Sequence, residues 1–240
     1  MTTRAKNIPL AERIIFALDV AEPGRALALV EQLDNQIRFF KVGLQLFLAG
    51  GWPVVEKIAA RGNKVMLDLK LHDIPATVRL AVAQMADRGV TLTTVHGYAP
   101  VVEAALAADS GVNILAVTVL TSMGQDELDE LRYPGTVEDL VLTRAKKVLA
   151  LGCHGLVCSA REARRLRREC GHNFLMVTPG IRPPDAAAND QQRIATPGQA
   201  IVDGADYLVI GRPIRDAADP QAAVAALFQE IDRSLAGKAK

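Results

Sequence analysis

The sequence contains no long uninterrupted apolar segment. Its longest apolar stretches, such as residues 114–120, have the length of a β-strand, whereas a membrane-spanning helix needs roughly 20 apolar residues. The first residues, MTTRAKNIPLAER, also lack the apolar core of a secretory signal peptide. We therefore expect a cytoplasmic protein with no membrane partner.

Cysteine and net charge are scarce as well. The three cysteines, Cys153, Cys158 and Cys170, show neither C-x-x-C spacing nor an even count, so we expect reduced thiols and no metal site built from them. The 28 basic and 27 acidic residues leave a formal net charge of +1, which offers no general attraction to nucleic acid. We interpret the basic run at 161–169 as a solvated helix face.

Short apolar runs alternate with amphipathic stretches along the whole chain. Half of the residues are hydrophobic, so a large core is available. Most runs are continuous and rich in Val, Ile and Leu, as is typical of strands buried on both faces. The predicted strands lie at 14–19, 37–42, 64–69, 91–95, 113–119, 154–158, 174–178 and 206–210. Clear helical patterns lie between them at 26–33, 54–60, 77–87 and 137–149.

This alternation predicts an α/β protein with a single (β/α)₈ barrel over residues 1–240. A doubly wound open sheet is the alternative, because the number of strands does not prove that the sheet closes. The proline-rich stretch that begins IRPPDAAAN, residues 181–191, is expected to form a mobile loop within that domain.

Residues 68–73, D-L-K-L-H-D, place three charges at the end of an apolar run. Alternate strand residues share a face, so Asp68 and Lys70 should point the same way, while Asp73 follows where the chain leaves the strand. Burial of such groups is expensive unless they pair, and pairing shifts their pKa values. The hexapeptide is therefore a candidate site for proton transfer, although a purely structural ion pair remains the alternative.

Polar residues also follow the other predicted strands. In a barrel, the carboxyl ends of the strands form the catalytic face, and the loops after strands seven and eight often bind phosphate. Those two loops contain glycine and arginine, which suit an anion because glycine lets backbone N–H groups approach and arginine grips phosphate with two donors. The residues are Asp19, Lys41, Asp68, Lys70, His96, Thr121, Ser122, Pro179, Gly180, Arg182, Gly211 and Arg212. We expect a phosphorylated substrate.

Six motifs taken together resemble the orotidine 5′-phosphate decarboxylase family. They run in the family's order between about residues 14 and 230, and they are A-L-D (17–19), K-V-G (41–43), D-L-K-L-H-D-I-P (68–75), V-L-T-S (119–122), T-P-G-I-R (178–182) and I-G-R-P (210–213). The D-x-K-x-x-D element alone is shared with other sugar-phosphate barrels, so the full set carries the resemblance. It implies conversion of orotidine 5′-phosphate to UMP and CO₂ without a metal or organic cofactor.

The resemblance also implies catalytic roles. Lys70 matches the proton donor, and Asp68 matches the carboxylate that faces the carboxylate of the substrate. Lys41 and Asp73 match the other members of an alternating Lys-Asp-Lys-Asp array. In the family, this second aspartate reaches the active site of a partner subunit, so the resemblance implies a homodimer.

Roles in substrate binding follow in the same way. Asp19 resembles a ligand of the ribose hydroxyls, and Thr121 and Ser122 resemble contacts to the ribose and to the pyrimidine edge. Ile74 and Thr77 would accompany Asp73 at the partner's site. The expected phosphate side comprises Pro179, Arg182, Gln191, Gly211 and Arg212.

Two other functions have to be weighed against this one. A Mg²⁺-dependent sugar-phosphate decarboxylase or synthase of the same barrel group is expected to have a glutamate ligand where this chain has Lys41, and a cation there would repel the metal. A non-catalytic phosphate-binding barrel would need no proton donor, so the intact Asp68, Lys70 and Asp73 set argues against it. We expect His72 and His96 to support the site by hydrogen bonds rather than to act in catalysis.

Overall fold

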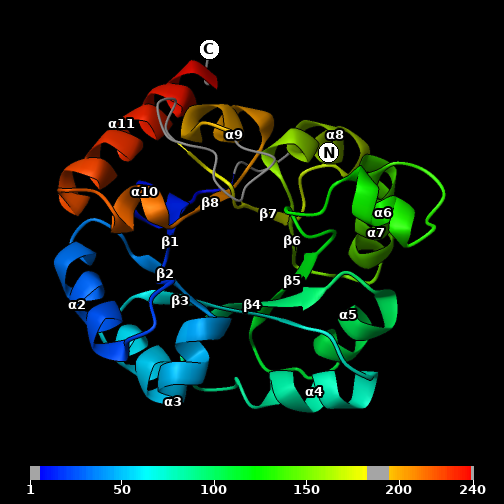
Figure 1. The fold of residues 1–240 in the computed structure, drawn as a ribbon, viewed down its shortest axis with the longest axis horizontal. Helices are drawn as coiled ribbons and strands as arrows, with labels where there is room; N and C mark the ends of the chain where they lie inside the picture. The colour runs from blue at the N-terminus through cyan, green and yellow to red at the C-terminus, as the bar shows by residue number, and fades with distance from the viewer. Residues whose placement is uncertain (1–5, 183–194, 239–240) are drawn as a thin grey trace.

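A closed barrel of eight parallel strands forms the centre of the molecule (Figure 1). The computed structural model describes residues 6–182 and 195–238. The strands pair in chain order and β8 pairs with β1, which confirms the predicted barrel and rules out the open sheet. They are β1 (Ile14–Ala17), β2 (Phe39–Gly43), β3 (Lys64–Leu71), β4 (Val90–His96), β5 (Asn113–Val117), β6 (Gly155–Val157), β7 (Leu175–Thr178) and β8 (Tyr207–Ile210).

The described helices pack around this barrel, most of them as an outer ring (Figure 1). They are α1 (Leu10–Arg13), α2 (Pro23–Leu33), α3 (Leu44–Ala60), α4 (Pro75–Ala83), α5 (Ala99–Leu106), α6 (Gln125–Glu130), α7 (Val137–Ala150), α8 (Ala160–Cys170), α9 (Pro197–Asp203), α10 (Arg212–Arg215) and α11 (Pro220–Lys238). Among the described residues, no helix is both long enough and apolar enough to cross a membrane.

Two predicted helices differ in extent from the observed ones. The helical pattern at 54–60 is only the second half of α3, which begins at Leu44 and contains a break at Gly51, where φ is +56°. The break changes the direction of the helix. The apolar residues before and after Gly51 therefore do not share one helical periodicity, and the sequence pattern revealed only the second half. The pattern at 77–87 corresponds to α4, which already ends at Ala83. The expected loop at 181–191 lies almost entirely outside the described residues.

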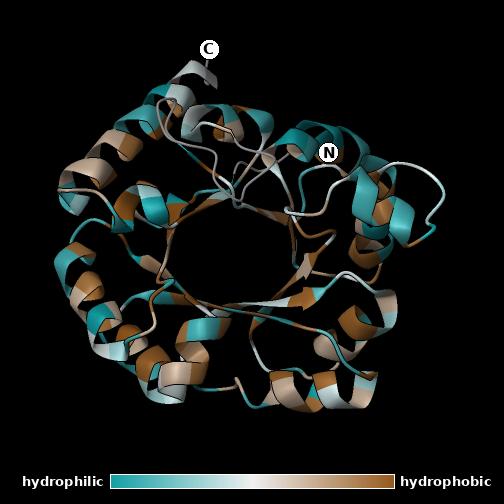
Figure 2. Cartoon of the chain, viewed as in Figure 1, coloured by the Kyte–Doolittle hydropathy of each residue, from teal (hydrophilic) through white to brown (hydrophobic). Residues whose placement is uncertain are grey.

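The strands bury both of their faces. Ile15, Phe39, Met66, Leu92 and Tyr207 belong to a cluster that fills the inside of the barrel, whereas alternate residues of the same strands pack outward against the helices. Figure 2 shows mostly brown strands at the centre and helices that carry both teal and brown residues around them. Since side chains alternate along a strand, the inward register that starts at Met66 continues to residues 68 and 70 at the carboxyl end.

Candidate active site

The carboxyl ends of the strands surround a cavity of about 550 Å³. Most of the predicted site residues line it: Asp19, Lys41, Asp68, Lys70, Thr121, Ser122, Pro179, Arg182, Gly211 and Arg212. They come from the ends of β1, β2 and β3 and from the loops after β5, β7 and β8. Residues more than 190 positions apart in the chain therefore meet in one site.

Four charged side chains in this cavity alternate in sign. The Lys41 Nζ donates to Asp19 Oδ1 at 2.8 Å and lies 3.6 Å from Asp68 Oδ2. The Lys70 Nζ lies 2.9 Å from both carboxylate oxygens of Asp68. The order is thus Asp19, Lys41, Asp68, Lys70, and each lysine has at least one carboxylate as its neighbour. The structure places Lys70 nearer to solvent than Lys41, because 38% of its side chain is exposed against 9% for Lys41.

The alternation keeps the buried members of this cluster charged. Burial alone would raise the pKa of Asp68, but the ammonium groups of Lys41 and Lys70 hold that pKa below its usual value. Burial likewise disfavours the charged form of Lys41, yet Asp68 and Asp19 raise the pKa of this lysine above its usual value. An ionised carboxylate thus lies between two cations inside a largely buried site.

The backbone at Lys70 departs from regular strand geometry. Its φ is +49°, a left-handed conformation that is uncommon for any residue other than glycine. The pairing of β3 with β4 also shifts here, because Leu67 pairs with Thr93 whereas Leu71 pairs with Val95. Four steps along β3 therefore correspond to two steps along β4, and the extra residues form a bulge that contains both Asp68 and Lys70.

The opposite side of the cavity carries the arginines. Arg182 is buried and its Nη1 donates to the carbonyl of Ile181 at 2.8 Å. Gly211 and Arg212 follow β8 at the start of α10. A Cβ atom at Gly211 would be in ordinary contact with Ala17 and Asp19, and all three residues line the cavity, so glycine leaves more of this part of the cavity free for a ligand. Gln191 lies outside the described residues.

Three predicted site residues are not part of this cavity. Asp73, Ile74 and Thr77 lie at the end of β3 and the start of α4, and all three are exposed. The Asp73 Oδ1 accepts the backbone N–H of Ile74 at 2.6 Å and makes no contact with Lys41 or Lys70. Within one chain, the array therefore consists of Lys41, Asp68 and Lys70, joined by Asp19.

The two histidines near the site pack on each other. The rings of His72 and His96 have centroids 4.8 Å apart, and His72 also stacks on Tyr98 at 4.8 Å. Burial lowers the pKa of His96, and the neighbouring His72, Arg144 and Lys70 lower it further. The contacts described for these two histidines are ring contacts, so the hydrogen-bonded support expected of them stays a prediction.

Sequence reasoning missed several residues that line or shape the site. Gln45 and Arg215 both line the cavity, and Arg215 donates to the backbone carbonyl of Asp19 at 2.8 Å while also pairing with Asp216. Thr94 bonds to both Asp68 and Lys70. Arg215 could have been found by its position one helical turn after Arg212. Nothing in the sequence distinguishes Thr94 from its neighbour Thr93.

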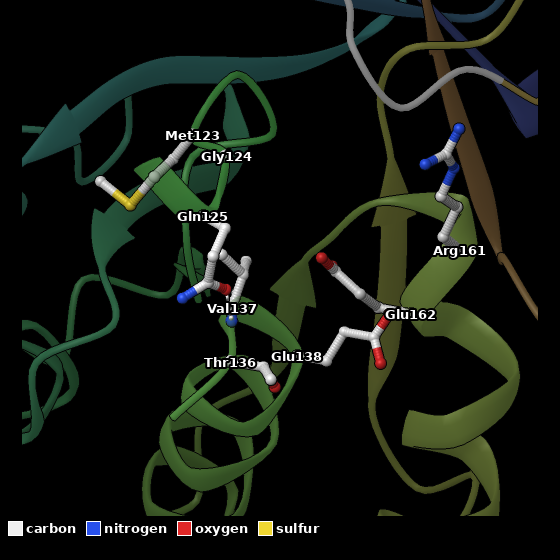
Figure 3. A pocket seen from close by; sticks show the side chains of 8 residues that line it. All are labelled: Met123, Gly124, Gln125, Thr136, Val137, Glu138, Arg161 and Glu162. Carbon is white, nitrogen blue, oxygen red and sulfur yellow. Dashed lines mark hydrogen bonds between the residues drawn. The ribbon is translucent and has the colours of Figure 1, made fainter. Parts of the chain in front are cut away.

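A second hollow, of about 480 Å³, lies between α6, α7 and the start of α8 (Figure 3). Two of its polar side chains are already engaged in hydrogen bonds to neighbouring residues of the same loops and helix ends. Gln125 bonds to Asp129, to the carbonyl of Gly135 and to the N–H of Val137, and Glu162 accepts the N–H of Ser159 at the beginning of α8. None of the alternating charges lines this hollow, so the chemistry belongs to the cavity at the strand ends.

Comparison with known proteins adds independent evidence. Residues 12–227 match the model of a family described as orotidine 5′-phosphate decarboxylase / HUMPS family. A protein of Rhodopseudomonas palustris named orotidine 5′-phosphate decarboxylase is 50% identical over 222 residues, which cover 92% of this chain and 94% of that protein. A protein of the same name from Methylococcus capsulatus is 47% identical over 220 residues, which cover 91% of each chain.

A solved structure shows the same architecture. The crystal structure of orotidine 5′-phosphate decarboxylase from Lactobacillus acidophilus superposes with a TM-score of 0.81 and is 36% identical in sequence. The match covers 92% of this chain and 99% of that one. The likeness therefore extends over the whole barrel and is not confined to the motifs of the site.

Proposed function

The chain belongs to the orotidine 5′-phosphate decarboxylase / HUMPS family and decarboxylates orotidine 5′-phosphate to UMP and CO₂ in pyrimidine synthesis, and we propose that it does so without a metal ion, with Lys70 as the proton donor. The observation that carries this proposal is the alternating row of charges. Lys70 lies at the open end of that row, 2.9 Å from Asp68, and it is the more exposed of the two lysines that line the cavity.

The chemistry requires a cation and a proton at one place. When the bond between C6 of the pyrimidine and the carboxylate carbon breaks, CO₂ leaves and the electron pair stays on C6. An ammonium held next to C6 stabilises this charge as it develops and then transfers a proton to the carbon. Lys70 becomes a neutral amine and regains its proton from solvent, so charge and protons balance.

Asp68 and Lys41 prepare this step. Asp68 is ionised in its buried position and would face the carboxylate of the substrate, which raises the energy of the bound substrate relative to the transition state. Its two oxygens also hold the Lys70 ammonium from one side. Lys41 bonds to Asp19, and in this proposal Asp19 in turn binds the ribose hydroxyls, with Thr121 and Ser122 at the ribose and the pyrimidine edge.

The phosphate of the substrate would bind at the arginine side of the cavity. Arg182 and Arg212, with the backbone of Gly211 and with Pro179 beside them, supply donors and positive charge there. Gln191 is proposed as a further ligand on the resemblance alone. Binding energy from this remote group contributes to kcat as well as to affinity, because it holds C6 against Lys70.

The decisive experiment compares turnover with and without chelator. We expect the loss of orotidine absorbance to proceed at an unchanged rate after exhaustive treatment with EDTA, because Lys41 and Lys70 supply the positive charge that Mg²⁺ supplies in metal-dependent relatives. Added Mg²⁺ should not increase the rate. Activity that disappears with chelator and returns with Mg²⁺ would instead support the metal-dependent sugar-phosphate enzyme.

We also propose that two chains form a homodimer in which Asp73, Ile74 and Thr77 complete the partner's site. This region exposes apolar side chains that a second copy could cover: Ile74 is 65% exposed and Leu80 is 55% exposed. Asp73 would then be the fourth member of the charge array, contributed across an isologous interface. A cytoplasmic location is part of the same proposal, and the three free cysteines fit it.

Mixed dimers test this arrangement. Lys70→Ala and Asp73→Ala homodimers should both be badly impaired, but in a mixed dimer one site collects both defects and the other collects neither. Random exchange by joint refolding makes about half of the dimers mixed, so on the order of a quarter of wild-type activity should return. Absence of recovery, with mixed dimers confirmed by mass, would place Asp73 in the site of its own chain.

A further inference from the structure

Thr94 is the only side chain on β4 that bonds to both residues at the chemical centre, as far as the described part of the chain shows. It lies in the inward register of β4, two residues after Leu92, and it is fully buried. Its Oγ1 accepts the backbone N–H of Lys70 at 2.9 Å and donates to Asp68 Oδ1 at 2.8 Å. The single hydroxyl proton and one lone pair are thus both committed to the proposed donor and its counter-ion.

The bulge in β3 explains why a hydroxyl is needed here. The pairing of β3 with β4 is regular up to Leu67 with Thr93 and resumes at Leu71 with Val95. Lys70, between these points, has a φ of +49°, and its N–H is bonded to the Thr94 side chain. The hydroxyl therefore takes the place of a ladder carbonyl and supports a backbone conformation that a lysine rarely adopts.

We propose that Thr94 is a positioning residue for the decarboxylation: its hydroxyl ties the left-handed backbone of Lys70 to the carboxylate of Asp68 and so holds the ammonium at the distance required for proton transfer to C6. The bond also favours the ionised form of Asp68, since Thr94 is among the groups that lower the pKa of this carboxyl, after Lys41 and Lys70. The inference rests on the proposed role of Lys70 as proton donor.

Thr93 provides a matched control. It is the adjacent residue of β4, it is equally buried, and its hydroxyl also makes a hydrogen bond, to the carbonyl of Leu67 at 3.0 Å. Its side chain lies on the opposite face of the strand, and its hydroxyl bonds to the backbone of β3 instead of to the Asp68 carboxylate or the Lys70 N–H. Valine at either position keeps the shape and removes one hydroxyl, so a loss that is merely structural should be similar for both variants.

The experiment compares Thr94→Val, Thr94→Ser and Thr93→Val by steady-state decarboxylation and thermal unfolding. We expect kcat of Thr94→Val to fall about 30- to 100-fold, as for a reacting group displaced by a fraction of an ångström, with KM changed less than about threefold because the phosphate contacts remain. Thr94→Ser should recover most of kcat. Thr93→Val should keep kcat within about twofold of the wild-type value, even if its melting temperature falls as far as that of Thr94→Val.

A pH profile separates positioning from general loss of structure. Without the Thr94 donor, Asp68 binds a proton more readily, so the acid limb of the kcat profile should move to higher pH in Thr94→Val and stay in place in Thr93→Val. Near-normal kcat in Thr94→Val, an equal loss in Thr93→Val, or no recovery with Thr94→Ser would each overturn the inference.

Two further variants keep the test decisive. If Thr94→Val does not fold, Thr94→Cys replaces it: a thiol is similar in size but a weak hydrogen-bonding group, so kcat should fall in the same way, and full activity would overturn the inference. Lys70→Ala is measured alongside. If Lys70→Ala retains normal kcat, the proposed donor is wrong, whereas an inactive Lys70→Ala with a fully active Thr94→Val refutes only the role of Thr94.

Discussion

Replacing Gly43 by alanine should damage the active site far more than the fold. Gly43 ends β2 and precedes α3 with φ −90° and ψ 178°, a conformation that alanine adopts without strain. The obstacle is the side chain itself, since a Cβ atom would lie 2.9 Å from Lys41 Nζ and 3.3 Å from Asp19 Oδ1. The glycine of the K-V-G motif therefore leaves the space that the ammonium group of its lysine, Lys41, occupies.

The size of the effect follows from what must move. Carbon and nitrogen normally approach to about 3.5 Å, so the ammonium has to retreat by roughly 0.5 Å, away from its 2.8 Å bond to Asp19. Because the ammonium ends a flexible chain, the fold should lose little, about 0.5–1 kcal/mol including the poorer N-cap of α3. Misplacement on this scale should lower kcat/KM about 10- to 100-fold, or roughly 1.4–2.7 kcal/mol.

Gly24 supplies the control. It lies near the start of α2, and a Cβ atom there would have nothing within 4 Å. Gly24→Ala should leave kcat/KM unchanged and raise stability by about 0.5–1 kcal/mol, as alanine does in a helix. Both variants are measured by loss of orotidine absorbance and by urea unfolding. Wild-type kcat/KM in Gly43→Ala, or a loss of activity no larger than its loss of stability, would refute the reasoning.

Three other perturbations address the remaining parts of the site. Lys70→Ala should abolish turnover with the circular dichroism spectrum unchanged, because proton delivery and carbanion stabilisation both depend on it; near-normal kcat with only a weaker KM would remove Lys70 from the chemistry. Arg212→Ala should cost about 2–5 kcal/mol in kcat/KM for orotidine 5′-phosphate and far less for orotidine, which lacks the phosphate; equal losses for both substrates would contradict the assignment. The Asp68 pKa lies below its usual value of 3.8 and the Lys41 pKa above its usual value of 10.5. The stability that Asp68 contributes is thus present above about pH 4, and it is lost as pH falls through the folded pKa of Asp68. The stability that Lys41 contributes is present below about pH 10, and it is lost as pH rises through the folded pKa of Lys41. Urea unfolding of wild type and Asp68→Asn should therefore differ by a constant amount between about pH 5 and 9, with a difference that shrinks in acid; a steep change near neutrality would show that another group dominates.

Local patterns were enough to predict the barrel and most of its polar rim. Eight apolar runs separated by helical stretches led to the correct strands, because a strand buried on both faces must be apolar along its length. The same period of two placed Asp68 and Lys70 on one face, and the structure brings both into one cavity with Lys41 and Asp19. Those predictions depend only on backbone geometry, which neighbouring residues determine.

The missed features depend on contacts between distant segments. The bulge that contains Lys70 is a mismatch between β3 and β4, and neither strand reveals it alone. Thr94 and Thr93 are identical in type, and only the side of the strand that each faces makes one a partner of Asp68 and the other a partner of Leu67. Arg215 acquires its contact with Asp19 because closure of the barrel brings β8 beside β1.

The sequence by itself determined which residue types lie at the end of each strand, because composition and period are written along the chain. Only the tertiary structure decided how those ends are aligned around the ring, which hydroxyl meets which carboxylate, and that Asp73 turns away from the cavity of its own chain. The physical reason is one of scale. Side-chain direction along a strand is set by local sterics, whereas a hydrogen bond of 2.8 Å requires two segments to be placed to within a few tenths of an ångström, which only the packing of the closed barrel achieves.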